Sequence, residues 1–209
     1  MSSTEILLRE RAALCDTFEK FGPDAPTLCE GWLTLDLAAH LVAREARSDA
    51  AIGLVFKPLA GHLQNVMNGY KERGYDTLVG MLRTGPPLMH RKGPLATANV
   101  NENFIHHEDI RRANGEGPRQ LDADTDAVLW KMLGLGARLA KREVKGAALT
   151  LRTPDGRERV VSTEGKPVSL TGEPGELSLL MAGRQGAAVV TFDGDNEAIA
   201  IVRAAQFGV

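Results

Sequence analysis

Glu102 and His106 stand four residues apart, a spacing that places both side chains on one face of a helix. A carboxylate and an imidazole held in this way are suited to bind a divalent metal ion. The pair alone is a weak signal, because the same spacing occurs on solvated helix faces and in short helix-stabilising contacts. Asn99 and Asp109 strengthen it, since they continue the polar stripe at intervals of three and four residues.

His40 offers a third ligand from a different stretch of the chain. Catalytic zinc commonly takes three protein ligands and keeps a fourth position for water or substrate, and two histidines with one glutamate form such a set. The sequence therefore predicts a metal site made of His40, Glu102 and His106.

Two aspartates are placed to orient these histidines. Asp36 precedes His40 by four residues and Asp109 follows His106 by three, so each is expected to accept the second ring N–H of its histidine. Both have an alternative role. Asp36 would also suit the first turn of a helix, where the helix dipole favours an acid, and Arg112 is an alternative partner for Asp109.

Three other polar residues are each expected first in a structural role. His107 points about 100° away from His106 on a helix, so we expect it to be a packing or surface partner of Glu108 or Arg111. Arg44 is expected in an ion pair, with an anionic substrate as the alternative. Arg184 lies near a helix end, where capping explains a cation, and substrate binding is its alternative role.

The elements that must position these residues follow from periodicity. Helical spacing predicts helices over residues 3–21, 34 to about 56, 59–83 (one or two helices around Gly74), 97–114 and 122–142. Alternation and turn residues then predict a hairpin over 149–162, a strand over 166–170, a helix over 174–182, a strand over 187–192 and a helix from Asp195 through Arg203. The predicted fold class is α+β, with a helical metal-binding domain over residues 1–143 and a small α+β domain over 144–209.

Composition narrows the function. The chain has 209 residues, of which 43% are hydrophobic and 25% charged, and its formal net charge is −2. These values are ordinary for a globular protein and offer no basic footprint, so we expect no nucleic-acid partner. No signal peptide or membrane span is recognisable, which favours the cytoplasm. Cys15 and Cys29 lack the spacing and context of a disulfide and are expected to be reduced.

Two segments carry a family resemblance. TLCEGWLTLDLAAHLVARE, which starts at Thr27, and ENFIHHEDIRRA, which starts at Glu102, together resemble the actinobacterial DinB-like group that includes mycothiol-dependent maleylpyruvate isomerases. The sequences GEPGEL and AGR, which start at Gly172 and Ala182, are similar to the small domain that follows the bundle in those proteins. The resemblance covers most of the chain and is closest to an uncharacterised branch of the group.

The resemblance implies a fold, a cofactor and a kind of reaction. The fold would be a DinB-like four-helix bundle followed by a small α/β module, with a divalent metal held by His40, Glu102 and His106. Zinc is the metal expected first. The activity implied is that of a thiol-dependent isomerase or transferase, in which the metal activates a thiol such as mycothiol towards an electrophilic substrate.

Two other functions fit the same residues. In the first, the metal only holds the bundle together, as in a non-catalytic metal-binding or stress-response protein. In the second, the chain binds no metal and is a helical interaction or carrier protein. The substrate and the oligomeric state remain open at this stage, a homodimer being one alternative.

Overall fold

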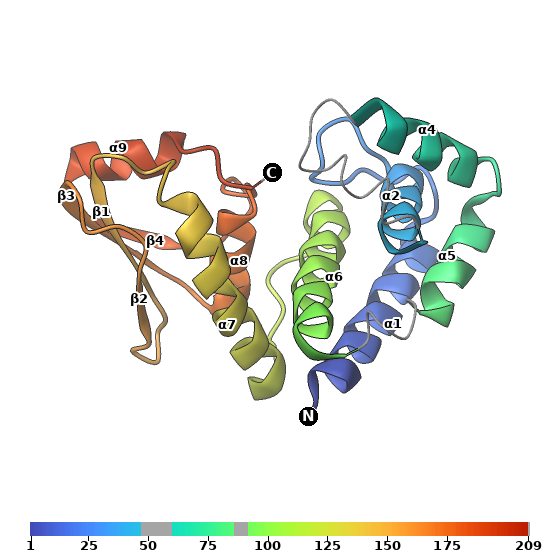
Figure 1. Ribbon diagram of the computed structural model, residues 1–209, viewed down its shortest axis with the longest axis horizontal. Helices are drawn as coiled ribbons and strands as arrows, with labels where there is room; N and C mark the ends of the chain where they lie inside the picture. Colours follow the sequence, from blue (N-terminus) through green and yellow to red (C-terminus); the bar gives the residue numbers. More distant parts are fainter. Residues whose placement is uncertain (47–59, 86–91, 209) are drawn as a thin grey trace. The chain divides into compact units, whose positions relative to one another are not determined.

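The computed structural model describes residues 1–46, 60–85 and 92–208, which form two compact units, Met1–Gly117 and Pro118–Val209 (Figure 1). The boundary predicted after residue 143 is wrong, because the units divide after Gly117. The cause is the helix α7 (Ala123–Ala140), which packs against α8 (Pro174–Met181) of the second unit. Periodicity identified α7 as a helix but carries no information about which core it joins.

The first unit is helical in its described residues. Its elements are α1 (Ser3–Phe21), α2 (Thr34–Ala46), α4 (Ala60–Lys71), α5 (Tyr75–Thr84) and α6 (Gly93–Ala113). The helix α1 packs along α6, while α2 contacts α4 and α5. Their apolar faces meet in one core that includes Phe18, Leu37, Met67 and Leu82.

Local signals explain where the first helix begins and ends. A capping box joins Ser2 and Glu5 at its start, because each side chain bonds the backbone N–H of the other residue. Gly22 follows its last residue with a φ of 74°, a conformation that glycine adopts without strain. These caps satisfy the backbone groups that a helix leaves unpaired at its ends.

The helix α6 begins at Gly93, four residues before the predicted start. Pro94 lies in its first turn, where proline is favoured because the N–H that it lacks would have no partner within the helix. Polar residues are unusually common on its buried side, among them Asn103, His106, His107 and Asp109. Buried polar groups need hydrogen-bond partners or ligands, so α6 is a candidate to carry a functional site.

The second unit combines a sheet with three helices. Its strands are β1 (Ala147–Arg152), β2 (Glu158–Val160), β3 (Lys166–Thr171) and β4 (Thr191–Gly194), in the order β2-β1-β3-β4. The outer pairs are antiparallel, whereas β1 and β3 run parallel, with Leu149 opposite Val168. The helix α9 (Asn196–Ala204), which is capped by Asp195, packs on β1, β3 and β4.

The structure confirms the α+β class and most predicted elements. The last strand lies at Thr191–Gly194, later than the predicted 187–192, because the apolar run before it does not pair with β3. The second predicted helix is observed as far as Ala46, and the rest of its predicted range, to about residue 56, lies outside the described residues. No helix in the described parts of the chain has both the length and the apolar character needed to cross a bilayer.

Candidate metal centre

His40, Glu102 and His106 come together where α2 meets α6. The Oε1 atom of Glu102 lies 3.3 Å from Nε2 of His106 and 3.9 Å from Nε2 of His40. One ligand atom from each residue falls within 4.8 Å of the others, and the two imidazole ring centres are 5.3 Å apart. Both histidines are buried, while Glu102 is partly exposed.

The donor set fits a small divalent cation. Zinc–ligand bonds of roughly 2.0–2.2 Å in a tetrahedral arrangement hold neighbouring ligand atoms about 3.3–3.6 Å apart. The spacings from Glu102 to the two histidines, 3.3 and 3.9 Å, are close to that range. Burial lowers the pKa of His40, which keeps its imidazole neutral, the form that ligates a metal.

The charges of the cluster are strongly coupled. Burial opposes ionisation of Glu102, yet the nearby imidazoles of His106 and His40 outweigh it and hold the pKa of Glu102 well below its usual range. Burial likewise opposes a charged His106, but hydrogen bonds with its neighbours, led by Asp109, raise the pKa of His106 well above its usual range. Without a metal, these shifts favour a protonated His106 beside an ionised Glu102.

Asp109 lies directly behind His106. Its Oδ2 atom is 2.9 Å from Nδ1 of His106, and the carboxylate is fully buried. Nε2 of His106 is thus the nitrogen that faces Glu102 and His40. The structure brings Asp109 and His106 together as expected, and Nε of Arg112, the alternative partner, donates to Glu108.

Cys29 belongs to the same surroundings, although the sequence analysis assigned it no role. Its Sγ donates to Oδ2 of Asp109 at 3.2 Å, and Cys29, His106 and Asp109 form a second group of potential ligands. No spacing signal could have found this contact, because residue 29 lies in the irregular segment before α2. In the sequence, the one feature that points to Cys29 is its position in the TLCEGW segment, which carries the family resemblance.

Asp36 does not orient His40. One of its carboxylate oxygens accepts the backbone N–H of Leu33, and the other is 2.9 Å from Nζ of Lys71. Asp36 is the third residue of α2 and therefore completes half of a capping box, the alternative role that the first-turn position offered. Nδ1 of His40 is buried and has no hydrogen-bond partner among the described residues.

The two arginines considered for substrate binding lie in different units. Arg44 contacts the cluster, because its Nε is 3.3 Å from Oε1 of Glu102 and its Nη1 donates to Oδ1 of Asn99 at 2.8 Å. Arg184 belongs to the second unit, where its guanidinium donates to the carbonyl of Ala182 just after α8. That bond is the capping contact typical of a cation at a helix end.

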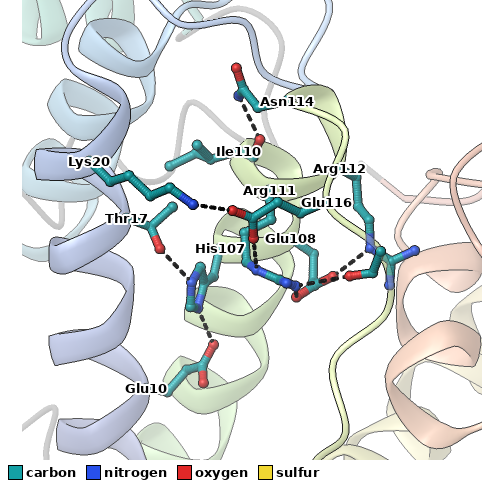
Figure 2. A network of polar contacts seen from close by, with 11 residues as sticks. Glu10, Thr17, Lys20, His107, Glu108, Ile110, Arg111, Arg112, Asn114 and Glu116 are labelled. Atoms are coloured by element: carbon teal, nitrogen blue, oxygen red, sulfur yellow. Dashed lines mark hydrogen bonds and ion pairs between the residues drawn. The ribbon is translucent and has the colours of Figure 1, made fainter.

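His107 has partners that the sequence analysis did not predict. Its Nδ1 lies 2.9 Å from Oε1 of Glu10 and its Nε2 lies 2.8 Å from Oγ1 of Thr17, both on α1 (Figure 2). The predicted partners, Glu108 and Arg111, instead pair with each other. The error arose because the direction of His107 on the helix was predictable but the identity of the neighbouring helix was not. His107 thereby joins α6 to α1 beside the candidate metal centre.

Trp32 forms a wall of the cluster. Its ring centre lies 5.1 Å from that of His40, at an angle of 53°. A large apolar ring beside the imidazole lowers the local polarity, which strengthens electrostatic interactions in the cluster.

No protein-family model and no curated protein sequence matches the chain. Among solved structures, it is similar to the crystal structure of the mycothiol-dependent maleylpyruvate isomerase, with a TM-score of 0.59 and 15% sequence identity. The match covers 91% of this chain and 91% of that one. The two proteins share a fold. At this identity the likeness carries no statement about activity, so function has to be argued from the site.

Proposed function

We propose that the chain is a metal-dependent enzyme that activates a low-molecular-weight thiol, as an isomerase or a transferase, with mycothiol as the thiol. The observation that carries the proposal is the convergence of Glu102 with two buried imidazoles from two helices. The fold shared with a mycothiol-dependent isomerase supports it, and we extend the likeness to a four-helix bundle around the metal.

Nε2 of His40, Oε1 of Glu102 and Nε2 of His106 would hold the cation, and zinc is the metal that we propose. A bound divalent cation supplies Lewis acidity, which lowers the pKa of a coordinated thiol and so favours the nucleophilic thiolate. Three protein ligands leave a position for that thiol.

The protein contributes orientation and charge. Asp109 accepts the Nδ1–H of His106, which leaves the lone pair on Nε2 directed at the centre. Arg44 contacts Glu102 at 3.3 Å and, being partly exposed, adds a positive charge beside the cluster. That charge would favour the approach of an anionic electrophile or thiolate.

A competing function is a structural metal site without catalysis. It is favoured by the second donor group, Cys29, His106 and Asp109, where a metal would tie the segment before α2 to α6 through protein ligands that include a sulfur. The two functions differ in coordination, since a structural zinc is closed by four protein ligands and a catalytic one keeps an open position. X-ray absorption of the zinc-loaded protein separates them: nitrogen and oxygen ligands alone support the enzyme, and a sulfur ligand that disappears in Cys29→Ser supports the structural role.

Metal analysis of freshly purified protein tests the ligand set. We expect about one divalent ion per chain, lost in His40→Ala and His106→Ala and retained in His62→Ala, a matched change at an exposed histidine of the same unit. Unchanged metal content in the first two variants would refute the site.

Catalysis needs its own test. Turnover of a panel of electrophiles, maleylpyruvate among them, is measured with and without mycothiol. We expect thiol-dependent turnover that disappears in Glu102→Ala. Activity that persists without thiol would refute the mechanism while leaving the metal site intact.

A further inference from the structure

The second unit contains a cationic cavity that the proposed function does not use. It lies between α7 and β2, has a volume of about 540 Å³, and is lined by Lys131, Arg138, Lys141 and Arg159 together with apolar groups such as Leu135 and Val160. The lining residues that the structure describes include no carboxylate. This volume lies within the range of small-molecule pockets, roughly 300–1,000 Å³.

The positive charge is concentrated on one face of α7. Lys131, Arg138 and Lys141 follow one another at helical spacing and line the same cavity. Lys141 reaches Glu164 at 3.1 Å, but Lys131 and Arg138 form no ion pair within the described parts of the chain. Neighbouring like charges on a helix repel each other, so this face gains from an anion placed over it.

Contacts with Trp130 hold the Arg159 side chain against α7. Its guanidinium lies over the ring of Trp130 at 4.9 Å, and its Nη2 donates to the carbonyl of Trp130 at 3.1 Å. Its Nη1 packs against Gly134, where a Cβ atom would lie only 2.6 Å away. The absence of a side chain at Gly134 therefore makes room for the guanidinium against the helix.

The cavity also has an apolar part. Leu135 and Val160 are 54% and 58% exposed, although both are large hydrophobic residues. Cations around exposed apolar side chains are complementary to a molecule that has a charged head and an apolar body.

We propose that this cavity binds an organic anion, a carboxylate or a phosphate monoester attached to an apolar body. Arg159 and the cations of α7 contact the head, and Leu135 and Val160 contact the body. The site is independent of the metal centre, and its test requires neither metal nor thiol.

Calorimetric titration of the full chain tests the proposal with octanoate and octyl phosphate, each below its micelle concentration. Inorganic phosphate and 1-octanol are the two half-ligands. We expect at least one of the amphiphiles to bind at least tenfold more tightly than either half-ligand, and the stronger of the two identifies the preferred head group. Equal binding of 1-octanol would refute the role of charge, and no binding of either amphiphile would refute the site.

A matched pair of glycines in α7 provides the decisive variants. Gly134→Ala displaces the Arg159 guanidinium, whereas a Cβ at Gly136 would meet only Met181 at 4.0 Å, an ordinary contact. Both changes add a better helix former, which in Gly134→Ala offsets the lost contacts between Arg159 and Trp130, so both variants are expected to fold. Loss of a charge-assisted hydrogen bond predicts binding about tenfold weaker or more in Gly134→Ala and unchanged in Gly136→Ala.

Equal binding by the two glycine variants would show that Arg159 does not contact the ligand. If Gly134→Ala does not fold, the Lys131→Gln/Arg138→Gln double variant replaces it. That variant must weaken octyl phosphate more than 1-octanol, and an equal effect on both would refute the proposal.

Discussion

Replacing Asp109 by asparagine removes one charge from behind the candidate metal centre and leaves the shape of the side chain nearly unchanged. The carboxylate is fully buried and lies 2.9 Å from Nδ1 of His106. As an anion it only accepts hydrogen bonds, so it keeps the proton on Nδ1 and the lone pair on Nε2. An asparagine can instead turn its NH₂ group towards Nδ1, which favours the tautomer that cannot ligate through Nε2.

The size of the effect follows from the lost bond. A buried hydrogen bond to a charged group contributes about 1.5–3 kcal/mol, and each 1.4 kcal/mol changes an equilibrium constant about tenfold. This range agrees with the loss of about 10–100-fold in metal affinity found when the partner of a ligating histidine is removed. We therefore expect the zinc dissociation constant of Asp109→Asn to rise by about 10–100-fold.

Asp36→Asn is the matched control. It is the same chemical change in the same unit, but Asp36 serves the backbone of Leu33 and the ammonium of Lys71 rather than a histidine. We expect it to lower the stability of the fold by about 1 kcal/mol through the weakened cap and to leave zinc affinity unchanged.

Competition between the protein and a chromophoric zinc chelator at constant pH measures both variants, and circular dichroism verifies their folding. Wild-type affinity in Asp109→Asn would refute the claim that this carboxylate sets the tautomer of His106. An equal loss in both variants would show that the effect comes from general destabilisation.

Three further outcomes are expected. Hydrogen bonding raises the pKa of His106 and the pKa of Glu102 is lowered, so zinc binding should release about one proton at neutral pH and weaken as the pH falls. Calorimetry in buffers of different ionisation enthalpy measures the proton release. A heat of binding that does not depend on the buffer would contradict it. Arg11 and Glu45 form a buried ion pair, so Glu45→Ala leaves the Arg11 charge without its carboxylate and should lower the free energy of unfolding in urea by about 3–5 kcal/mol. The double variant Arg11→Met/Glu45→Leu should recover most of that loss, and a double variant as unstable as Glu45→Ala would contradict this. Gly165→Ala should destabilise the fold by about 4 kcal/mol or more, since its Cβ would lie 2.1 Å from the carbonyl oxygen of Gly146, whereas Gly156→Ala, also at positive φ but in open space, should cost only about 1–2 kcal/mol in the same assay.

Local patterns in the sequence were sufficient for most of the elements. The range of α1, the start of α9 at Asp195 and the change from helical to alternating spacing before β1 are properties of neighbouring residues, and the structure bears them out. The late position of β4 was missed because pairing with β3, rather than local apolar character, decides where that strand lies. The assignment of α7 to the second unit was missed for a similar reason, since its partner α8 is distant in the sequence.

The candidate site shows the same division. Glu102, His106 and Asp109 lie on one helix, so their spacing alone determined that they share a face, and their contacts could be predicted. The approach of His40 was suggested only by its residue type and by the family resemblance, because nothing local orients α2 against α6. The packing of the helices also placed Cys29 beside Asp109 and gave His107 its partners on α1. A helical period determines the angle between residues within one helix, whereas the packing of a core determines which helices meet, and only that packing joined His40 to Glu102 and His106.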